Sequence, residues 1–190
     1  MYVHLMRPSV AYRFTASGIH AYIMVCNSGC PWMILKCRMS DGEHSDSMAI
    51  DTEMLRLSGQ IGVLLRERGL TCGTAESCTG GGIAFALTSV AGSSEYVQGG
   101  IVAYSNVVKM RQLNVAPDTL ERVGAVSADC GREMATGVRA ALGVDVGISS
   151  TGIAGPGGAT ARKPVGLVYI GVATERDVAV QELHLTGDRQ

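Results

Sequence analysis

The sequence predicts an α/β protein with a layered single domain, in which a mixed β-sheet is flanked by helices. Segments with helical periodicity alternate with short apolar, β-branched segments, an order typical of helices packed on a sheet. Near the C-terminus, the strand-like segments 165–174 and 178–185 are separated only by the polar turn Glu175-Arg176-Asp177, which favours an antiparallel pair. With 190 residues and 46% hydrophobic side chains, the chain can build one sizeable core.

The first predicted helix begins after Asp51 or Thr52 as N-cap and ends at Gly69, because glycine readily takes the left-handed conformation that stops a helix. Its apolar side chains share one stripe: Met54, Leu57, Ile61, Leu64 and Leu65. A short buried strand is predicted over 70–75, followed after a turn by a helix of small residues over about 80–89.

The middle of the chain continues the alternation. Residues 96–104 have the composition of a strand, in which Gly99-Gly100 marks a bulge or a close backbone approach. A short helix is expected from Asn106. Ser127 as N-cap and Gly143 as stop delimit a longer helix, and a strand over 145–151 follows it.

The N-terminal stretch has a different character from the rest. Residues 1–40 contain four basic and no acidic side chains, and they show no periodicity. We expect this extension to lie outside the fold, either disordered or translated from a start codon placed too early. A basic targeting peptide is a second interpretation. A metal-binding segment using Cys26, Cys30 and Cys37 is a third, although their spacing matches no zinc pattern. The domain proper is predicted at 51–190.

Charge and hydropathy exclude several function classes. A formal net charge of −1 gives no whole-chain reason to bind nucleic acid or an anionic membrane. No uninterrupted apolar run approaches the roughly 18 to 20 residues that span a bilayer, so we expect a cytoplasmic protein with neither partner. The six cysteines are unevenly spread and do not indicate a disulfide framework. The four histidines are scattered, so we predict no metal, no histidine triad and no cofactor.

The first candidate for chemistry is Ser77, in the stretch A-E-S-C-T-G-G-G at 75–82. This stretch sets a hydroxyl at a strand end, just before a helix whose first N–H groups can bind an oxyanion or a phosphate. A serine at such a place more often caps the helix, so the motif alone leaves both interpretations open. It is neither a Walker A loop nor a G-x-S-x-G elbow.

The second candidate cluster is Y-S-N-V-V-K at 104–109, which follows another predicted strand. Burial lowers the pKa of a lysine, so a neutral Lys109 amine, helped by the Tyr104 phenol, could take a proton from a serine. Taken singly, Tyr104 is more simply a packing residue and Lys109 a solvated one. Only their pairing with Ser77 favours a catalytic interpretation.

Two later segments are candidates for ligand binding. The glycine-rich loop 152–164 follows the predicted strand, and its many glycines carry a backbone entropy cost unless close approach is needed. A flexible connector is equally consistent with it. Arg189 near the chain end could bind a phosphate through two parallel hydrogen bonds, or be disordered.

Together, in order, these motifs resemble those of the CinA C-terminal domain family, over about residues 52–190. The shared motifs are A-E-S-C-T-G-G, V-A-Y-S-N-x-x-K, G-A-V-S, and T-G-I-A-G-P-G-G with K-P-V-G. The resemblance implies an amidohydrolase that converts nicotinamide mononucleotide to nicotinic acid mononucleotide and ammonia without a metal. In that reaction Ser77 would be the nucleophile, and Tyr104 and Lys109 would activate its hydroxyl.

The resemblance also implies a substrate site and a partner. The substrate-binding residues would be Glu76, Thr79, Gly80, Gly81, Asn106, Thr151, Gly152 and Arg189. The partner would be a small-molecule nucleotide, and because the family commonly self-associates we expect a homo-oligomer. The family usually continues past G-D-R into a closing helix, which we expect to be lacking here. This leaves a catalytically impaired nucleotide-binding module as an alternative, and an interaction protein linked to competence as a weaker one.

Overall fold

The structure, a computed structural model, describes residues 20–21, 37–38 and 52–186. The first two segments are the strands β1 (His20–Ala21) and β2 (Cys37–Arg38), which pair antiparallel although the sequence predicted no regular element there. The rest of the predicted extension, including Cys26 and Cys30, lies outside the described residues, as does Arg189.

The predicted mixed sheet is confirmed. Its five strands are β3 (Cys72–Glu76), β4 (Val97–Val102), β5 (Val146–Gly152), β6 (Leu167–Ala173) and β7 (Val178–His184). They lie in the order β4-β3-β5-β6-β7, with β4, β3 and β5 parallel to one another. β6 runs antiparallel to β5, and β7 runs antiparallel to β6, as the short turn between β6 and β7 predicted.

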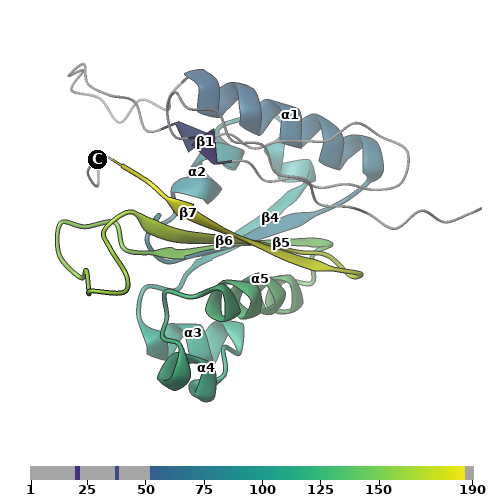
Figure 1. Cartoon of the computed structure of the whole chain (residues 1–190). Helices are drawn as coiled ribbons and strands as arrows, with labels where there is room; N and C mark the ends of the chain where they lie inside the picture. The colour runs from purple at the N-terminus through teal and green to yellow at the C-terminus, as the bar shows by residue number, and fades with distance from the viewer. Residues whose placement is uncertain (1–19, 22–36, 39–51, 187–190) are drawn as a thin grey trace, which may run out of the picture.

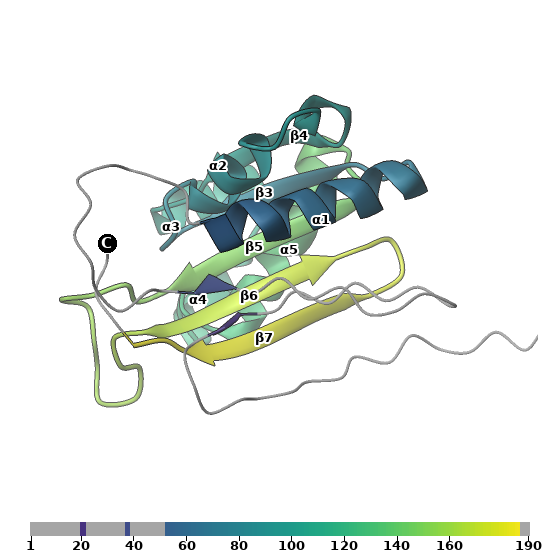
Figure 2. The ribbon, with the colours of Figure 1, turned by 90° about the horizontal axis from the view of Figure 1, so that it is seen from above.

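Helices cover both faces of this sheet. They are α1 (Thr52–Arg68), α2 (Gly82–Thr88), the 3-10 turn η1 (Ser93–Glu95), α3 (Asn106–Leu113), α4 (Pro117–Arg122) and α5 (Ala128–Leu142). Figure 1 shows α1 and α2 above the sheet and α3, α4 and α5 below it. Seen from above in Figure 2, α1 runs along the sheet, whose edges are β4 and β7. None of the helices in the described ranges is long and apolar enough to cross a bilayer.

Among these α-helices, only α4 was not predicted from the sequence. This helix is six residues long, too short to show a periodicity, but Pro117 in its first turn and Asp118 beside it are start signals. The apolar stripe predicted for α1 does face the core, where Leu57, Ile61 and Leu65 are buried. Burying a leucine side chain contributes roughly 1.5–3 kcal/mol, so this stripe holds α1 against the sheet.

A bulge in the edge strand confirms the interpretation of Gly99-Gly100. Cys72 of β3 pairs with Val97, but the next residue, Gly73, pairs with Gly99, so one residue of β4 is left over. At Gly100, a Cβ would lie 2.5 Å from Thr74 Oγ1, so a side chain there would displace the Thr74 hydroxyl. Beyond the bulge, the last residue of β4, Val102, pairs with Glu76, the last residue of β3, so the segment 103–109 leaves the sheet beside Ser77.

The carboxyl ends of β3, β4 and β5 meet at one edge of the sheet, because these strands are parallel and adjacent. Ser77 follows the first of them and Ala103-Tyr104 the second, while Gly152 ends the third. Segments far apart in the sequence therefore converge at this edge.

Candidate active site

Ser77 and Lys109 form a buried polar pair at the carboxyl edge of the sheet. Ser77 is 9% exposed, and its N–H donates to the Ser150 carbonyl of β5 at 3.0 Å. Lys109 lies in α3 and is 1% exposed, with its Nζ 3.0 Å from Ser77 Oγ. The structure thus brings together two of the three residues expected to carry the chemistry.

The surroundings of Lys109 favour a neutral amine. Its Nζ donates to the backbone carbonyls of Ala103 at 2.7 Å and Tyr104 at 3.3 Å. None of the ion pairs within the described residues includes Lys109. Burial lowers the pKa of Lys109 below its ordinary value, against smaller opposing effects of Cys130 and Cys78. An uncharged amine has two N–H bonds for the two carbonyls and a lone pair left for the Ser77 hydroxyl.

Tyr104 is positioned differently from what the sequence suggested. It is 63% exposed, and no hydrogen bond within the described residues involves its phenol. Its contribution to the pair is the main-chain carbonyl that holds Lys109. The expected contact between the phenol and Ser77 is therefore not present in this structure.

Glu76 was expected to contact a substrate, but its carboxylate is directed into the protein. It is 1% exposed and accepts hydrogen bonds from backbone N–H groups of Gly81 at 3.0 Å, Ile83 at 3.0 Å and Ala84 at 2.8 Å. Thr79 Oγ1 donates a fourth at 2.7 Å. The carboxylate therefore occupies the N-terminus of α2.

The glycine amides at this helix start were expected to be unpaired and open to an anion, but in this structure they have partners within the protein. The Gly81 amide is taken by Glu76, and the Gly80 amide donates to the Ser77 carbonyl at 3.2 Å. Gly81 precedes α2 in a left-handed conformation with no side-chain cap of its own, so Glu76 supplies the cap from the preceding strand.

Ser150 is a site residue that the sequence reasoning missed. It is fully buried, and its Oγ lies 2.6 Å from Thr79 Oγ1 while its carbonyl holds the Ser77 amide. Cys78 lies between Ser77 and Thr79 in the sequence. Burial raises the pKa of its thiol, and nearby backbone amides and the Ser150 side chain oppose this rise. The signal in the sequence was the run Ser149-Ser150-Thr151 in a buried strand, since buried hydroxyls need partners.

Of the remaining predicted site residues, Thr151 and Gly152 have structural contacts and Asn106 is exposed. Thr151 is buried and its hydroxyl donates to the Ala125 carbonyl at 2.7 Å. Gly152 is needed by packing, because a Cβ there would lie 2.7 Å from the Leu167 carbonyl oxygen. Asn106 is exposed in the first turn of α3. Within the described ranges, no hydrogen bond joins any of these three to the Ser77–Lys109 pair.

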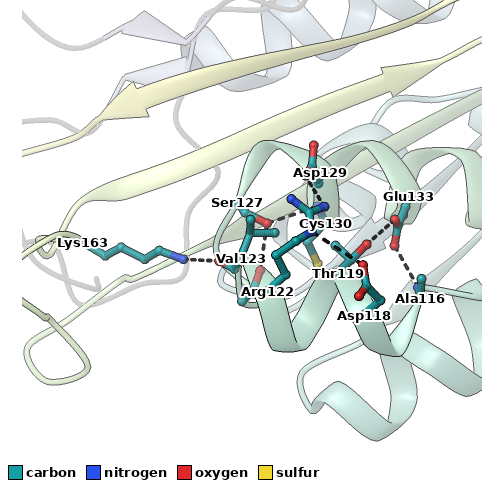
Figure 3. A network of polar contacts seen from close by, with 11 residues as sticks. Ala116, Asp118, Thr119, Arg122, Val123, Ser127, Asp129, Cys130, Glu133 and Lys163 are labelled. Atoms are coloured by element: carbon teal, nitrogen blue, oxygen red, sulfur yellow. Dashed lines mark hydrogen bonds and ion pairs between the residues drawn. The ribbon is translucent and has the colours of Figure 1, made fainter.

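A polar network fastens the glycine-rich loop to the helices below the sheet (Figure 3). Lys163 reaches from this loop and donates to the carbonyls of Val123 at 2.6 Å and Val126 at 2.7 Å. Ser127 accepts from the Cys130 amide and so caps α5. The sequence reasoning gave Lys163 no role, because the carbonyls that bind it lie about 40 residues earlier.

In the same network, Glu133 of α5 caps α4 as Glu76 caps α2. Its carboxylate accepts from the Ala116 amide at 2.9 Å and from the Thr119 hydroxyl at 2.5 Å. Both glutamates thus satisfy a backbone N–H and a threonine hydroxyl at the start of a short helix.

Sequence comparisons identify relatives of this arrangement. A family model described as the CinA C-terminal domain matches residues 54–190. A CinA-like protein of Thermosynechococcus vestitus is 54% identical over 134 residues, covering 70% of this chain and 32% of that protein. A CinA-like protein of Synechocystis is 50% identical over the same length, with the same coverage. The chain thus spans about a third of the length of the curated relatives it matches.

Solved structures share the fold. The competence/damage inducible protein CihA of Agrobacterium tumefaciens is 40% identical with a TM-score of 0.70, covering 73% of this chain and 84% of that one. The competence damage-inducible protein A of Klebsiella pneumoniae is 33% identical, also with a TM-score of 0.70, covering 72% and 84%.

Proposed function

Because the chain belongs to the CinA C-terminal domain family, we propose that it is an amidohydrolase that deamidates nicotinamide mononucleotide. The products are nicotinic acid mononucleotide and ammonia, and the partner is this small nucleotide. The observation that carries the proposal is the buried contact between Lys109 Nζ and Ser77 Oγ. A lysine without a carboxylate partner, next to a serine, suits a base that activates a nucleophile.

In the first half of the reaction, the neutral Lys109 amine takes the proton of the Ser77 hydroxyl as Oγ attacks the carboxamide carbon. The C–N bond then breaks, and the leaving nitrogen takes this proton from Lys109 and departs as ammonia. The nucleotide remains bound to Ser77 as an ester. Proton transfer by a positioned base typically contributes 10²–10⁴-fold to the rate.

In the second half, Lys109 takes a proton from a water molecule that attacks the ester carbon. The bond to Ser77 breaks, and Oγ regains the proton from Lys109. The second water proton stays on the new carboxylic acid, which releases it to solvent, so the nucleotide leaves with a carboxylate in place of its carboxamide. The carbonyls of Ala103 and Tyr104 keep Nζ directed at Oγ through both halves. The role of Tyr104 in this proposal is therefore that of its main chain.

The decisive experiment measures ammonia and nicotinic acid mononucleotide released by the purified protein. We expect Ser77→Ala to lose at least about 10³-fold in kcat, as expected for removal of a nucleophile. Ser149→Ala is the matched control: Ser149 is also buried, but its hydroxyl donates to the Gly131 carbonyl. It should remain active. Calorimetric binding of the nucleotide without any product from a folded wild type would reject the hydrolase and favour a binding module.

A further inference from the structure

The carboxylate of Glu76 accepts four hydrogen bonds and is buried one residue before Ser77. Three of its donors are amides at the start of α2 and the fourth is the Thr79 hydroxyl. The Glu76 side chain is therefore hydrogen-bonded to the 77–81 loop at Thr79 and at Gly81, where the loop joins α2. Three of these bonds end on Oε2 and one on Oε1, and with Glu76 only 1% exposed its carboxylate is not presented to a substrate hydroxyl at the surface.

The same loop is held from a second direction by β5. Thr79 Oγ1 lies 2.6 Å from Ser150 Oγ, and the Ser77 amide donates to the Ser150 carbonyl. Glu76, Thr79 and Ser150 thus form one chain of contacts that runs beneath the loop. The position of Ser77 Oγ relative to Lys109 depends on the loop conformation that this chain maintains.

We propose that Glu76 is a positioning residue, which holds the 77–81 loop so that Ser77 Oγ faces Lys109 and which closes the N-terminus of α2 to any substrate anion. The proposal rests on the proposed function for its assay. Its consequence is that the phosphate of a nucleotide is bound away from α2, so a change at Glu76 alters turnover and leaves substrate affinity nearly unchanged.

Glu133 offers a matched control for a purely structural effect. It too accepts from a backbone amide and a threonine hydroxyl at the start of a short helix, but its partners Ala116 and Thr119 belong to α4 and the residue before it. Glu133→Gln and Glu76→Gln remove the same kind of interaction. In Glu76→Gln the new NH2 group faces a backbone N–H donor, and in Glu133→Gln the bond from the Ala116 amide loses its charged acceptor, so both variants should melt at a lower temperature.

The test compares steady-state kinetics of the two variants well below their melting temperatures. We expect Glu76→Gln to lower kcat by about tenfold to a hundredfold, because small displacements of reacting groups have effects of this size. Its KM should stay within about threefold of the wild-type value. Glu133→Gln should keep the wild-type kcat. If Glu76→Gln does not fold, Thr79→Val removes one of the four donors and should lower kcat in the same direction.

Three results would overturn the proposal. An increase in KM at constant kcat would make Glu76 a substrate contact. An unchanged kcat and KM would make it dispensable, and an equal loss of kcat in Glu133→Gln would make the effect one of general stability.

If the wild type releases no ammonia, the proposed function fails on its own. The acetylation rate of Ser77 by p-nitrophenyl acetate, followed by intact mass, then replaces kcat: acetyl passes to Oγ, p-nitrophenolate leaves, and Lys109 takes the hydroxyl proton. A wild type acetylated no faster than Ser77→Ala would overturn both proposals.

Discussion

The Lys109 amine lies 3.0 Å from the Ser77 hydroxyl oxygen, although 32 positions separate the two residues in sequence. The contact exists because β3 and β4 are parallel neighbours, so the segments that follow them emerge at the same edge of the sheet. Lys109 has no carboxylate partner among the ion pairs of the described ranges, and its Nζ is instead held by two carbonyls.

The rate of deamidation should rise with pH as Lys109 loses its proton. Burial lowers the pKa of Lys109 from its ordinary value of 10.5, so the rise should level off below that pH. Lys109→Arg should be inactive throughout, because a guanidinium stays protonated. A pH–rate profile of kcat/KM for both proteins checks this, and a wild-type rate that falls with pH over this range would contradict a lysine base.

The free energy of unfolding should also depend on pH through the lowered pKa of Lys109, and this dependence can be measured without an activity assay. Since the folded-state pKa of Lys109 is lowered, the unfolded state binds more protons between the folded pKa and 10.5, and stability should rise with pH in that window. Lys109→Met removes this component. Urea titrations at neutral and alkaline pH should show a smaller gain for Lys109→Met than for the wild type, and equal gains would indicate that Lys109 is not perturbed.

Close packing of α3 against α5 should make Gly137 intolerant of any side chain. A Cβ at Gly137 would overlap the main chain of Leu113, so Gly137→Ala should destabilise the protein by about 3 kcal/mol. Gly59 is the control, since its added Cβ meets no atom within 4 Å and it lies inside α1. Gly59→Ala should stabilise by up to about 1 kcal/mol. Thermal melts of both variants test the contrast, and similar melting temperatures would refute it.

Asp145 joins the starts of β3 and β5 and should make stability sensitive to acid. Its Oδ2 accepts from the Thr71 amide and hydroxyl, each at 2.8 Å, and these bonds lower the pKa of Asp145 below its ordinary value of 3.8. The contribution is present above that value and lost as pH falls through the folded pKa. Because the group is exposed, we expect only about 1 kcal/mol. Asp145→Asn should lose it at pH 7 and match the wild type more closely near pH 2, as measured by urea unfolding.

The sequence by itself determined the strands of the main sheet, every α-helix except α4, and the family. The stripe of α1, the cap at Ser127 and the stop at Gly143 are signals within a few residues, and each element formed where they predicted it. The position of Ser77 at a strand end also followed from local pattern. Such features depend on neighbours one or two turns away, so they can be read from the chain.

Tertiary structure decided what each side chain contacts. Glu76 and Tyr104 stand in motifs that implied substrate and catalytic contacts. In the structure the Glu76 carboxylate caps α2, whereas Tyr104 contributes its main-chain carbonyl to Lys109 and its ring is exposed. A motif fixes the kind of side chain, whereas its partner depends on which strands are adjacent and how closely α2 approaches β3. Since a buried polar group must find a partner wherever the packing supplies one, the roles of Glu76, Ser150 and Lys163 became visible only once the sheet had brought distant segments together.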